Sequence, residues 1–476
     1  MTGDGDVALV VFTRDLRIAD NPVLYQASSA ANVVCAFVHD DSLLSGMTMN
    51  SRRTAFLADC LADLDHALRK LGTHLVQRRG DWVAEVLGLA TEVGARSIRL
   101  SDDVTPYARR RFARLEEGAA RSVEVRRSPG LSIVAPGAIT PTGGDHYRVF
   151  TPYYRRWLGA PRRRLLPSPT SLLGPVSGGL SPHPVTVATS RELLIPASEG
   201  TRLGGEAAAE AQMARWVAGA HTRYGEHRDD LAEPATSGLS PYLHFGCVSP
   251  LQVEMALGRL PGTDRFVRQL CWRDFYFQIL RARPTAAWSD FVERGEVPRS
   301  DPISYAAWCD GLTGVPIVDA AMRQLAGEGT ISNRARMIAA SFLTRHLGID
   351  WRDGARHFLR RLIDADIALN NLNWQWMAGR GTGSNPHRVL SPTRQARRFD
   401  PLGTYVRRHV PELRDLDPGV IHEPWLLGPG ERSRLGYPEP IVPIEPGRVT
   451  DGSPGGPALT ERFSEPHMAI RGRKRS

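Results

Sequence analysis

The chain has 476 residues, of which 42% are hydrophobic, so it is long enough to bury more than one core and to form two or three domains. Its formal net charge of +9 is carried almost entirely by arginine, because Lys70 and Lys474 are the only lysines among the 60 basic residues. Arginine binds phosphate with a two-pronged guanidinium, which suits an anionic partner, although genomic base composition also favours arginine over lysine.

The five cysteines and the lengths of the apolar runs exclude several classes of protein. The cysteines show no CxxC spacing and no cluster with histidine, so neither a disulfide framework nor a zinc site is indicated. No apolar run reaches the roughly 20 residues that a membrane span needs, and the amino terminus lacks the features of a signal peptide. We therefore expect a cytoplasmic protein with no membrane partner and no metal.

Between Val7 and about Pro129, short β-branched segments alternate with helical stretches. This alternation predicts an α/β domain with a mostly parallel sheet and a possible ligand site where the strand order reverses. No GxGxxG motif follows the first strand, which continues into Thr13–Arg17 instead, so ordinary dinucleotide binding is disfavoured. The predicted strands are 7–12, 32–38, 74–77, 97–100 and 123–125.

The composition changes after residue 130 and again near residue 205. The intervening segment is rich in Pro, Gly and Ser and has little periodicity, which predicts a connection between domains. Its basic run at 162–164 indicates a solvated surface. After 205, apolar residues recur at helical spacing, and eight of the ten tryptophans fall there. The predicted parts are an α/β domain at 1–130, a linker at 131–204, a helical domain at 205–440 and a disordered basic tail at 441–476.

A loop of hydroxyl and glycine residues stands directly before a predicted helix that begins with proline. The loop consists of Thr236, Ser237, Gly238, Leu239 and Ser240. Hydroxyls and backbone amides in this position bind phosphate oxygens, although an ordinary helix cap has the same composition.

Two helical segments combine aromatic rings with hydrogen-bond donors. In 266–280, one face carries Gln269, Trp272, Arg273 and Tyr276, a stacking plane beside donors for bases or phosphate. Core packing would explain the tryptophan but not the arginine. On a second helix, Asn333 and Met337 lie one turn apart. Arg336 lies on another face of that helix and would need an acidic partner if it were buried.

The segment 362–386 is unusually polar for a stretch that also holds tryptophans. Its notable residues are Asp364, Asp366, Asn370, Asn371, Asn373, Trp374 and Trp376. Buried amides and carboxylates need partners, so this composition makes a poor ordinary core. It predicts a polar ligand cavity with aromatic walls.

Taken in order, these motifs resemble the DNA photolyase/cryptochrome family, most closely its class I enzymes for cyclobutane pyrimidine dimers. The matching motifs are FTRDLR at 12–17, TSGLSPYLHFG at 236–246, CWRDFY at 271–276, PIVDAAMRQL at 316–325, NRARM at 333–337 and NWQW at 373–376. The resemblance implies a Rossmann-like α/β antenna domain followed by an all-α domain that holds FAD in a folded conformation. It also implies light-driven electron transfer from reduced FAD to a dimer flipped out of DNA. A cryptochrome-like photoreceptor with the same flavin is the alternative.

The resemblance also implies which residues meet the cofactor. The implied FAD contacts are Tyr224, Thr236, Ser237, Gly238, Leu239, Ser240, Arg336, Asp364, Asp366 and Asn370. Among them, Arg336 and Asp364 pair beside the isoalloxazine ring. Asn370 lies beside flavin N5, where a neutral amide cannot hand over a proton, which is consistent with FAD kept as the anionic hydroquinone.

A second set of residues is implied for the DNA and for the electron. The DNA contacts are Arg228, Gln269, Trp272, Arg273, Tyr276, Asn333, Arg334, Met337, Trp376 and Gln395, with Trp272 and Trp376 as walls of the lesion pocket. The catalytic group comprises Trp374, Trp351, Asn370 and Gln269, of which the two tryptophans carry electrons to the flavin. We expect a monomer that acts on damaged DNA and associates with the nucleoid when bound to it.

Three positions depart from the family's pattern. Gln269 replaces a glutamate that hydrogen-bonds the dimer, so slower repair is expected. The loop 329–334 lacks the family's tryptophan and histidine, which argues against the (6-4) photoproduct class. Pro298 stands where the outermost electron-carrying tryptophan would be, and Trp308 or Tyr305 is the substitute that we expect.

The antenna chromophore is suggested by the segment 104–109, which resembles the deazaflavin-binding members of the family. The glutamate typical of folate-binding members is absent at Pro106. We therefore expect 8-hydroxy-5-deazaflavin, with methenyltetrahydrofolate or no antenna as alternatives. Only three cysteines follow residue 240, too few for the four ligands of a [4Fe–4S] cluster.

Overall fold

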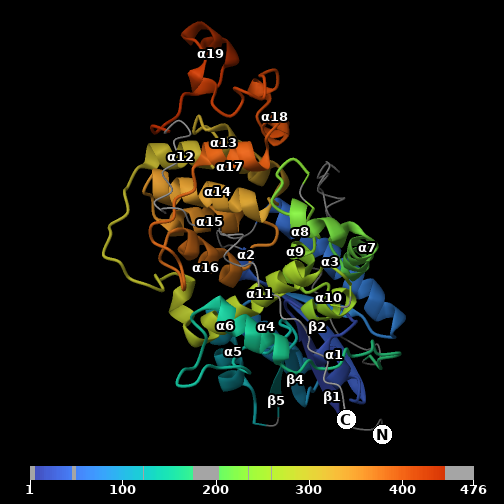
Figure 1. Cartoon of the computed structure of the whole chain (residues 1–476). Helices are drawn as coiled ribbons and strands as arrows, with labels where there is room; N and C mark the ends of the chain where they lie inside the picture. The colour runs from blue at the N-terminus through green and yellow to red at the C-terminus, as the bar shows by residue number, and fades with distance from the viewer. Residues whose placement is uncertain are drawn as a thin grey trace, which may run out of the picture. The chain divides into compact units, whose positions relative to one another are not determined.

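The amino-terminal part of the chain is built on a parallel sheet of five strands (Figure 1). The strands are β1 (Val7–Phe12), β2 (Asn32–Asp40), β3 (Leu75–Gly80), β4 (Ser97–Ser101) and β5 (Glu124–Ser128). Their order across the sheet is β3-β2-β1-β4-β5, so the direction of winding reverses between β1 and β4. All five predicted strands are present, and the predicted α/β class is confirmed.

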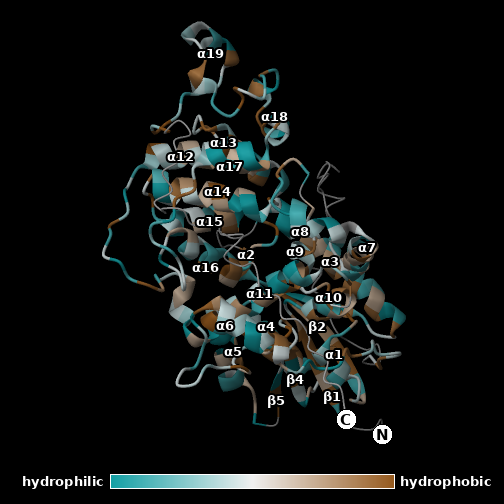
Figure 2. Ribbon diagram, viewed as in Figure 1, coloured by the Kyte–Doolittle hydropathy of each residue, from teal (hydrophilic) through white to brown (hydrophobic). Residues whose placement is uncertain are grey.

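The central strands are buried because helices cover both faces of the sheet. Along β1, Val10 and Phe12 belong to one apolar cluster, whereas Leu9 and Val11 belong to another. The run is therefore apolar throughout rather than alternating, as parallel sheets require, and the strands lie toward the hydrophobic end of the scale in Figure 2. The helices of this part are α1 (Pro22–Ala27), α2 (Asp41–Leu44), α3 (Ser51–Lys70), α4 (Trp82–Glu92) and α5 (Pro106–Gly118).

The second half of the described chain is helical, as its spacing of apolar residues predicts. The helices nearest the candidate site are α7 (Glu206–Val217), α8 (Tyr224–His227), α9 (Ser240–Phe245), α10 (Pro250–Leu257), α11 (Asp264–Ala282), α14 (Asn333–Ser341), α15 (Trp351–Arg361) and α16 (Ile367–Met377). The outer helices are α12 (Pro302–Asp310), α13 (Pro316–Glu328), α17 (Pro392–Phe399), α18 (Thr404–His409) and α19 (Pro429–Leu435). The predicted all-α class of this part is thus confirmed.

In its described residues, the segment predicted as an irregular linker contains one regular element, α6 (Phe150–Gly159). Asp274 of α11 fastens this segment to the helical part. Its carboxylate accepts hydrogen bonds from the backbone amides of Ile133 (3.1 Å) and Val134 (2.9 Å) and from Nε1 of Trp157 (2.9 Å). Sequence periodicity missed α6 because its buried face consists of only a few aromatic side chains.

The computed structural model describes residues 6–44, 50–121, 123–174, 203–233, 235–258 and 260–444. Met1–Val442 form one compact unit and Pro443–Ser476 a second. Most of the predicted linker beyond residue 174 and most of the predicted tail lie outside the described residues. Within the described ranges, no helix is both long and apolar enough to cross a membrane.

Removal of the Asp274 carboxylate tests its importance for the fold. In Asp274→Ala, three buried donors lose their charged acceptor, so the free energy of unfolding should fall by about 3 kcal/mol or more. Denaturant unfolding followed by circular dichroism measures this loss. Asp264→Ala, an exposed position in the first turn of the same helix, is the control, and its effect should stay below about 1 kcal/mol. Equal losses in the two variants would contradict this assignment.

Candidate functional site

A buried carboxylate, Asp364, is held by side chains from two helices. Arg336 of α14 donates from Nη2 to both carboxylate oxygens, at 2.9 and 2.8 Å. The side chain of Ser240, at the start of α9, lies near the same carboxylate and helps to lower its pKa. Burial alone would raise the pKa of Asp364, but the Arg336 charge and these hydrogen bonds hold it below its ordinary value. The carboxylate is therefore ionised, and the structure pairs Arg336 with Asp364.

The amide of Asn370 on α16 has a fixed orientation. Its Nδ2 donates to the carbonyl oxygen of Ala355 (3.1 Å) and to Oδ1 of Asn371 (2.9 Å). Asn371 in turn donates to the carbonyl oxygen of Ala287 (2.5 Å). Because the two backbone carbonyls can only accept, they set the direction of both amides. Both hydrogens of Asn370 are used inside the protein, so its oxygen is the group that it can offer to a ligand.

Arg14, directly after β1, reaches into the helical part of the chain. Its guanidinium forms an ion pair with Asp366 through Nη2 and another with Asp103, 3.3 Å from Nη1. Its Nε donates to the carbonyl oxygen of His244 in α9 (3.3 Å). The other oxygen of Asp366 accepts the backbone amides of the first turn of α16. One guanidinium thus joins the end of β1 to both helices of the site.

The backbone is tightly packed at the same junction. Gly246 ends α9 in the left-handed region, with φ of 71°. A Cβ atom there would lie only 1.9 Å from the carbonyl oxygen of Arg14. Leu16 donates its amide to the carbonyl oxygen of Phe245 (3.2 Å), and Arg17 donates to that of Gly246 (2.9 Å). Glycine is therefore required at this position on both conformational and steric grounds.

The loop before α9 turns hydroxyl groups outward. Thr236 and Ser240 are exposed, whereas Ser237 and Leu239 are buried. Gly238 adopts the left-handed conformation, with φ of 65°, at the turn between them. Because Ser240 lies near the Asp364 carboxylate, the predicted phosphate contacts and the predicted flavin contacts are neighbours. A dinucleotide that used both would have to be folded.

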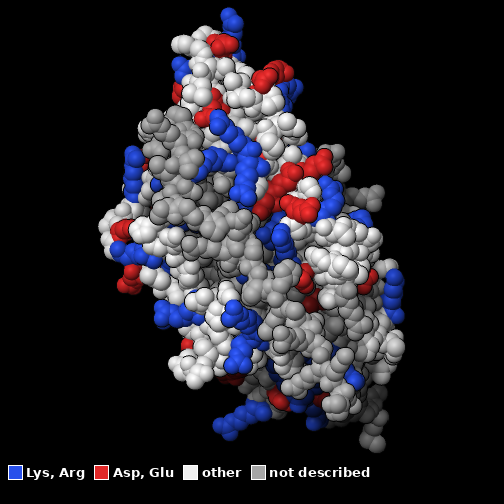
Figure 3. Space-filling view, viewed as in Figure 1, with Lys and Arg blue, Asp and Glu red and all other residues white. Residues whose placement is uncertain are grey.

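A cluster of charged and polar side chains lies beside Tyr224. The guanidinium carbon of Arg228 is 5.8 Å from the centre of the Tyr224 ring. Asp229 pairs with Arg334 (3.1 Å) and more loosely with Arg228 (3.9 Å). Arg334 also donates to Oε1 of Gln395 on α17 (3.2 Å). The structure therefore brings together the three residues predicted to meet the DNA strand, and Figure 3 shows arginine side chains gathered where α17 lies.

Two predicted DNA contacts, Arg273 and Tyr276, instead lie inside the protein. Arg273 donates to the carbonyl oxygens of Leu131 (2.6 Å) and Leu243 (3.0 Å) and is buried. The Tyr276 hydroxyl donates to Oδ1 of Asn373 (3.0 Å), which joins α11 to α16. In this structure both side chains bridge elements within the fold. The spacing that they share with Trp272 did not reveal this burial, because α11 is buried on most of its sides.

Trp272 and Trp376 present partly exposed rings from α11 and α16. Trp272 lies one turn before Tyr276, and Trp376 lies one turn after Asn373. The hydrogen bond between Tyr276 and Asn373 joins the two helices. Trp272 stacks on Phe150, with ring centroids 3.7 Å apart and an interplanar angle of 2°. The guanidinium carbon of Arg388 lies 4.8 Å from the centre of the Trp376 ring. Both indoles are thus held in place with surface left for stacking.

The remaining predicted lesion contacts are accessible. Gln269 is exposed on α11, one turn before Trp272. Asn333 is exposed at the start of α14, and its Nδ2 lies 3.5 Å from Sδ of Met337. These three side chains are available to a molecule that approaches from solvent.

The predicted electron-carrying tryptophans are both buried, with Trp374 3% and Trp351 2% exposed. The ring of Trp374 meets Trp308 edge-on, at a centroid distance of 6.1 Å and an angle of 78°. Trp308 in turn stacks on Tyr305 at 6.1 Å and 22°. Tyr305 is partly exposed, and its hydroxyl donates to the carbonyl oxygen of Asp353 (3.2 Å). A path of adjoining rings therefore leads from Trp374 toward the surface.

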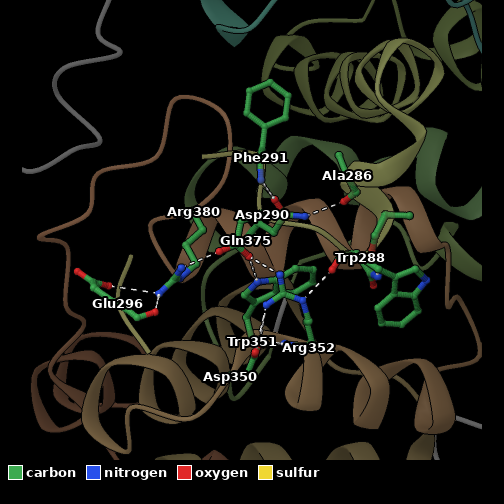
Figure 4. A network of polar contacts seen from close by, with 12 residues as sticks. Ala286, Trp288, Asp290, Phe291, Glu296, Asp350, Trp351, Arg352, Gln375 and Arg380 are labelled. Atoms are coloured by element: carbon green, nitrogen blue, oxygen red, sulfur yellow. Dashed lines mark hydrogen bonds and ion pairs between the residues drawn. The ribbon is translucent and has the colours of Figure 1, made fainter. Parts of the chain in front are cut away.

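Trp351 lies in a charged network around Asp290 (Figure 4). The Asp290 carboxylate accepts from Nε1 of Trp351 (2.9 Å), from Arg352 (2.7 Å) and from Arg380 (2.6 Å). Burial opposes ionisation here, but these partners hold the pKa of Asp290 below its ordinary value. Gln375 of α16 fastens the neighbouring loop by accepting the amide of Phe291 (2.8 Å).

Comparison with known proteins identifies the family of the chain. Residues 8–171 match the family model "DNA photolyase", and residues 266–450 match "FAD binding domain of DNA photolyase". The chain is also 46% identical over 451 residues to the deoxyribodipyrimidine photo-lyase of Streptomyces griseus, which covers 93% of this chain and 98% of that protein. The chain belongs to the DNA photolyase/cryptochrome family. Its helical part is therefore an FAD-binding domain.

Two solved structures of photolyase/cryptochrome proteins superpose on nearly the whole chain. A class III photolyase from Agrobacterium tumefaciens is 31% identical with a TM-score of 0.81, over 93% of this chain and 95% of that one. A cryptochrome from Synechocystis is 27% identical with a TM-score of 0.82, over 93% of this chain and 98% of that one. The family likeness thus spans repair enzymes and a cryptochrome.

The groups assembled around Asp364 fit FAD. Outward hydroxyls suit phosphate oxygens, and a fixed amide oxygen beside an ionised guanidinium–carboxylate pair suits the polar edge of a flavin. The residue that sequence reasoning missed is Arg14. It stands in the FTRDLR motif of the photolyase/cryptochrome family, but its partner Asp366 is 352 positions away. The motif alone could have drawn attention to Arg14, but not to that partner.

The ion pair of Arg336 and Asp364 predicts how FAD binding responds to acid. The ionised form of Asp364 contributes above the ordinary aspartate pKa of about 3.9, and the contribution is lost as the pH falls through the lowered pKa. In Arg336→Met, the largest influence that opposes burial is lost, so the pKa of Asp364 rises. FAD should then be released at a pH higher by on the order of one unit.

Release can be followed by flavin fluorescence between about pH 7 and pH 3. Arg323→Met is the matched control, because it breaks an ion pair with Glu412 (2.7 Å) that does not involve the residues of the FAD site. An unchanged release midpoint in Arg336→Met would contradict the assigned role of this pair.

Proposed function

We propose that this protein splits cyclobutane pyrimidine dimers in DNA in a light-dependent reaction, as a deoxyribodipyrimidine photo-lyase. The observation that carries the proposal is the Asp364 site, in which α9, α14 and the residues before α16 converge in a chain 46% identical to a protein of that name. The chemistry is a carbon–carbon lyase reaction.

Reduced FAD, when bound and excited by light, supplies the electron that opens the dimer. The residues of the protein bind the flavin, orient it and keep protons away from it. The oxygen of Asn370 can accept a hydrogen bond at flavin N5 but cannot donate a proton there. Asp364 and Asp366 remain ionised, since each is matched by a guanidinium. The pocket thus favours a flavin that carries its negative charge without protonation.

The damaged bases would have to leave the DNA stack to reach this pocket. Trp272 and Trp376 are placed to stack on them, each contact being worth about 1–3 kcal/mol. Gln269, Asn333 and Met337 would line the lesion. Arg228, Arg334 and Gln395 would hold the strand beside it by its phosphates.

A cryptochrome-like photoreceptor is the second candidate. The observation that favours it is the exposed amide of Gln269 at the position where a carboxyl group assists repair, together with the likeness to the Synechocystis cryptochrome. Both candidates need FAD, but only the first needs the lesion pocket formed by Trp272 and Trp376. Repair of dimer-containing DNA under light therefore separates them.

Further proposals concern the antenna and the working form of the protein. Thr105 caps α5 in the segment resembling deazaflavin-binding proteins, and the neighbouring Tyr107 donates to the Asp40 carboxylate (2.6 Å). We infer an 8-hydroxy-5-deazaflavin antenna, with a folate or no antenna as alternatives. We also infer the domain limits 1–130, 131–204, 205–440 and 441–476, a monomer, and a cytoplasmic location at the nucleoid.

The repair reaction can be tested by exchange of two side chains. Gln269→Glu should raise the rate of dimer splitting about fivefold, because a carboxyl group strengthens the hydrogen bond to the reacting dimer by about 1 kcal/mol. Asn370→Asp should lower repair, because its carboxyl group can protonate or repel the reduced flavin. The measurement is loss of dimers from single- and double-stranded oligonucleotides under blue light. Wild-type protein that holds reduced FAD but repairs neither substrate would overturn the proposal in favour of a photoreceptor.

The route by which electrons reach Trp374 can be tested separately. We propose that Trp374 is refilled through Trp308 and Tyr305, since their rings adjoin while Pro298 offers no aromatic ring. Trp308→Phe should slow photoreduction of FAD at least tenfold without loss of bound FAD, because a phenyl ring is far harder to oxidise than an indole. Transient absorption of the protein measures the effect. Trp288→Phe, a partly exposed indole, is the control. Photoreduction as fast as in the parent would exclude this route.

A further inference from the structure

Arg14 forms ion pairs with two carboxylates that belong to different parts of the fold. Nη2 meets Asp366 at the start of α16, whereas Nη1 meets Asp103 at 3.3 Å. The side chain of Arg14 is 19% exposed, and those of Asp366 and Asp103 are 2% and 8% exposed. At this degree of burial each ion pair is weakly screened, so a change at one carboxylate alters the other.

Asp103 lies where the sheet reverses its winding. It follows β4, whose neighbour across the reversal is β1, and Arg14 follows β1. The second oxygen of Asp103 accepts the backbone amide of Thr105 (2.7 Å), the residue that caps α5. The crevice at the carboxyl ends of such strands is where α/β domains bind ligands. Asp103 therefore stands at the edge of the sheet where α/β domains bind their ligands.

Asp366 lies at the other end of the same guanidinium. Its second oxygen accepts the amides of Ala368 (2.9 Å) and Leu369 (3.0 Å), so its position sets the first turn of α16. Asn370 follows one turn later on that helix. A displacement of Asp366, or a loss of its counter-charge, is thus transmitted to the pocket that holds the flavin.

We propose that Arg14 is a positioning residue of the FAD pocket, which neutralises and orients Asp366 from across the domain boundary and couples the crevice at Asp103 to the flavin. The proposal rests on the proposed binding of FAD beside Asp364 and Asp366. It predicts that ligands of the crevice and the redox state of the flavin influence each other's affinity, by the reciprocity of linked equilibria.

The other charged groups around Asp366 do not replace Arg14. Arg273 is close enough to lower the pKa of Asp366, but its guanidinium donates to the carbonyl oxygens of Leu131 and Leu243. Burial and the Arg14 charge lower the pKa of His244 to about 3, so this ring is neutral at physiological pH. Within the described ranges, the ion pair of Asp366 is formed by Arg14.

The coupling predicts in which direction each substitution shifts the midpoint potential of bound FAD. A merely structural role would not produce these opposite shifts. In Arg14→Met, Asp366 keeps its negative charge without its counter-ion, so the anionic reduced flavin is disfavoured relative to the oxidised one. In Asp103→Asn, Arg14 keeps its full charge for Asp366 and the flavin, so the reduced state is favoured. Both substitutions act through Arg14, but they should shift the midpoint potential of bound FAD in opposite directions.

The experiment measures the midpoint potential of bound FAD by spectroelectrochemistry in the full-length protein. Arg14→Met should weaken binding of reduced FAD about tenfold more than binding of oxidised FAD. For a two-electron couple, this lowers the midpoint potential by about 30 mV. Asp103→Asn should raise the potential, and Arg14→Lys should restore part of the loss, because it keeps the charge but not the fork.

Arg162→Met is the matched control. It removes a guanidinium of similar burial, 15% exposed, that pairs with Glu254 (2.7 Å). It should lower thermal stability without moving the potential. If Arg14→Met does not retain FAD, Asp103→Asn and Arg14→Lys still decide the question. Shifts of the same sign in Arg14→Met and Asp103→Asn, or no shift in either, would overturn the inference. Wild-type protein that binds no FAD would instead overturn the proposed function on which it rests.

Discussion

The guanidinium of Arg14 joins the segment after β1 to helices of the FAD-binding domain, and it is largely shielded from solvent. A charge with so little access to solvent is costly unless its hydrogen-bonding capacity is used. Arg14 meets this condition with Asp103, Asp366 and the carbonyl oxygen of His244. These three partners stand just after β4, at the N-cap of α16 and in α9, so the Arg14 side chain links three elements. The close approach of Gly246 to the Arg14 backbone leaves little room for these elements to slide.

The helix α16 carries the side chains that follow from this junction. Asp366 caps the helix, Asn370 has its amide nitrogen held inside the protein, and Trp374 packs so closely on α15 that a Cβ atom at Gly354 would lie 2.3 Å from its ring. Asn371 and Gln375, both fully buried, tie down the backbone of Ala286 and Ala287. The polar character of this helix therefore serves two purposes, one toward the ligand and one toward the segment packed behind it.

The predictable features are those that sequence spacing encodes locally. The five strands follow from β-branched runs, and the ion pair of Arg336 with Asp364 follows from the cost of an unpaired buried charge. Partners that are distant in sequence leave no such trace. Arg162, expected on a solvated surface, instead forms a buried pair with Glu254. Arg273 and Tyr276 share a helical face with Trp272, but periodicity does not reveal that their side of α11 faces the protein interior.

The two tryptophans nearest to the electron path differ in how they would carry a positive charge. The ring of Trp351 lies 4.8 Å from the guanidinium carbon of Arg352, while its N–H faces the carboxylate of Asp290. Trp308 is fully buried and donates to a neutral carbonyl oxygen, that of Ala339 (3.1 Å). A cation in such an apolar place is costly and cannot persist there. A path through Trp308 is therefore useful only if it ends at a group that becomes neutral on oxidation. Tyr305 is such a group, because an oxidised phenol sheds its proton, and its partial exposure lets water take that proton away.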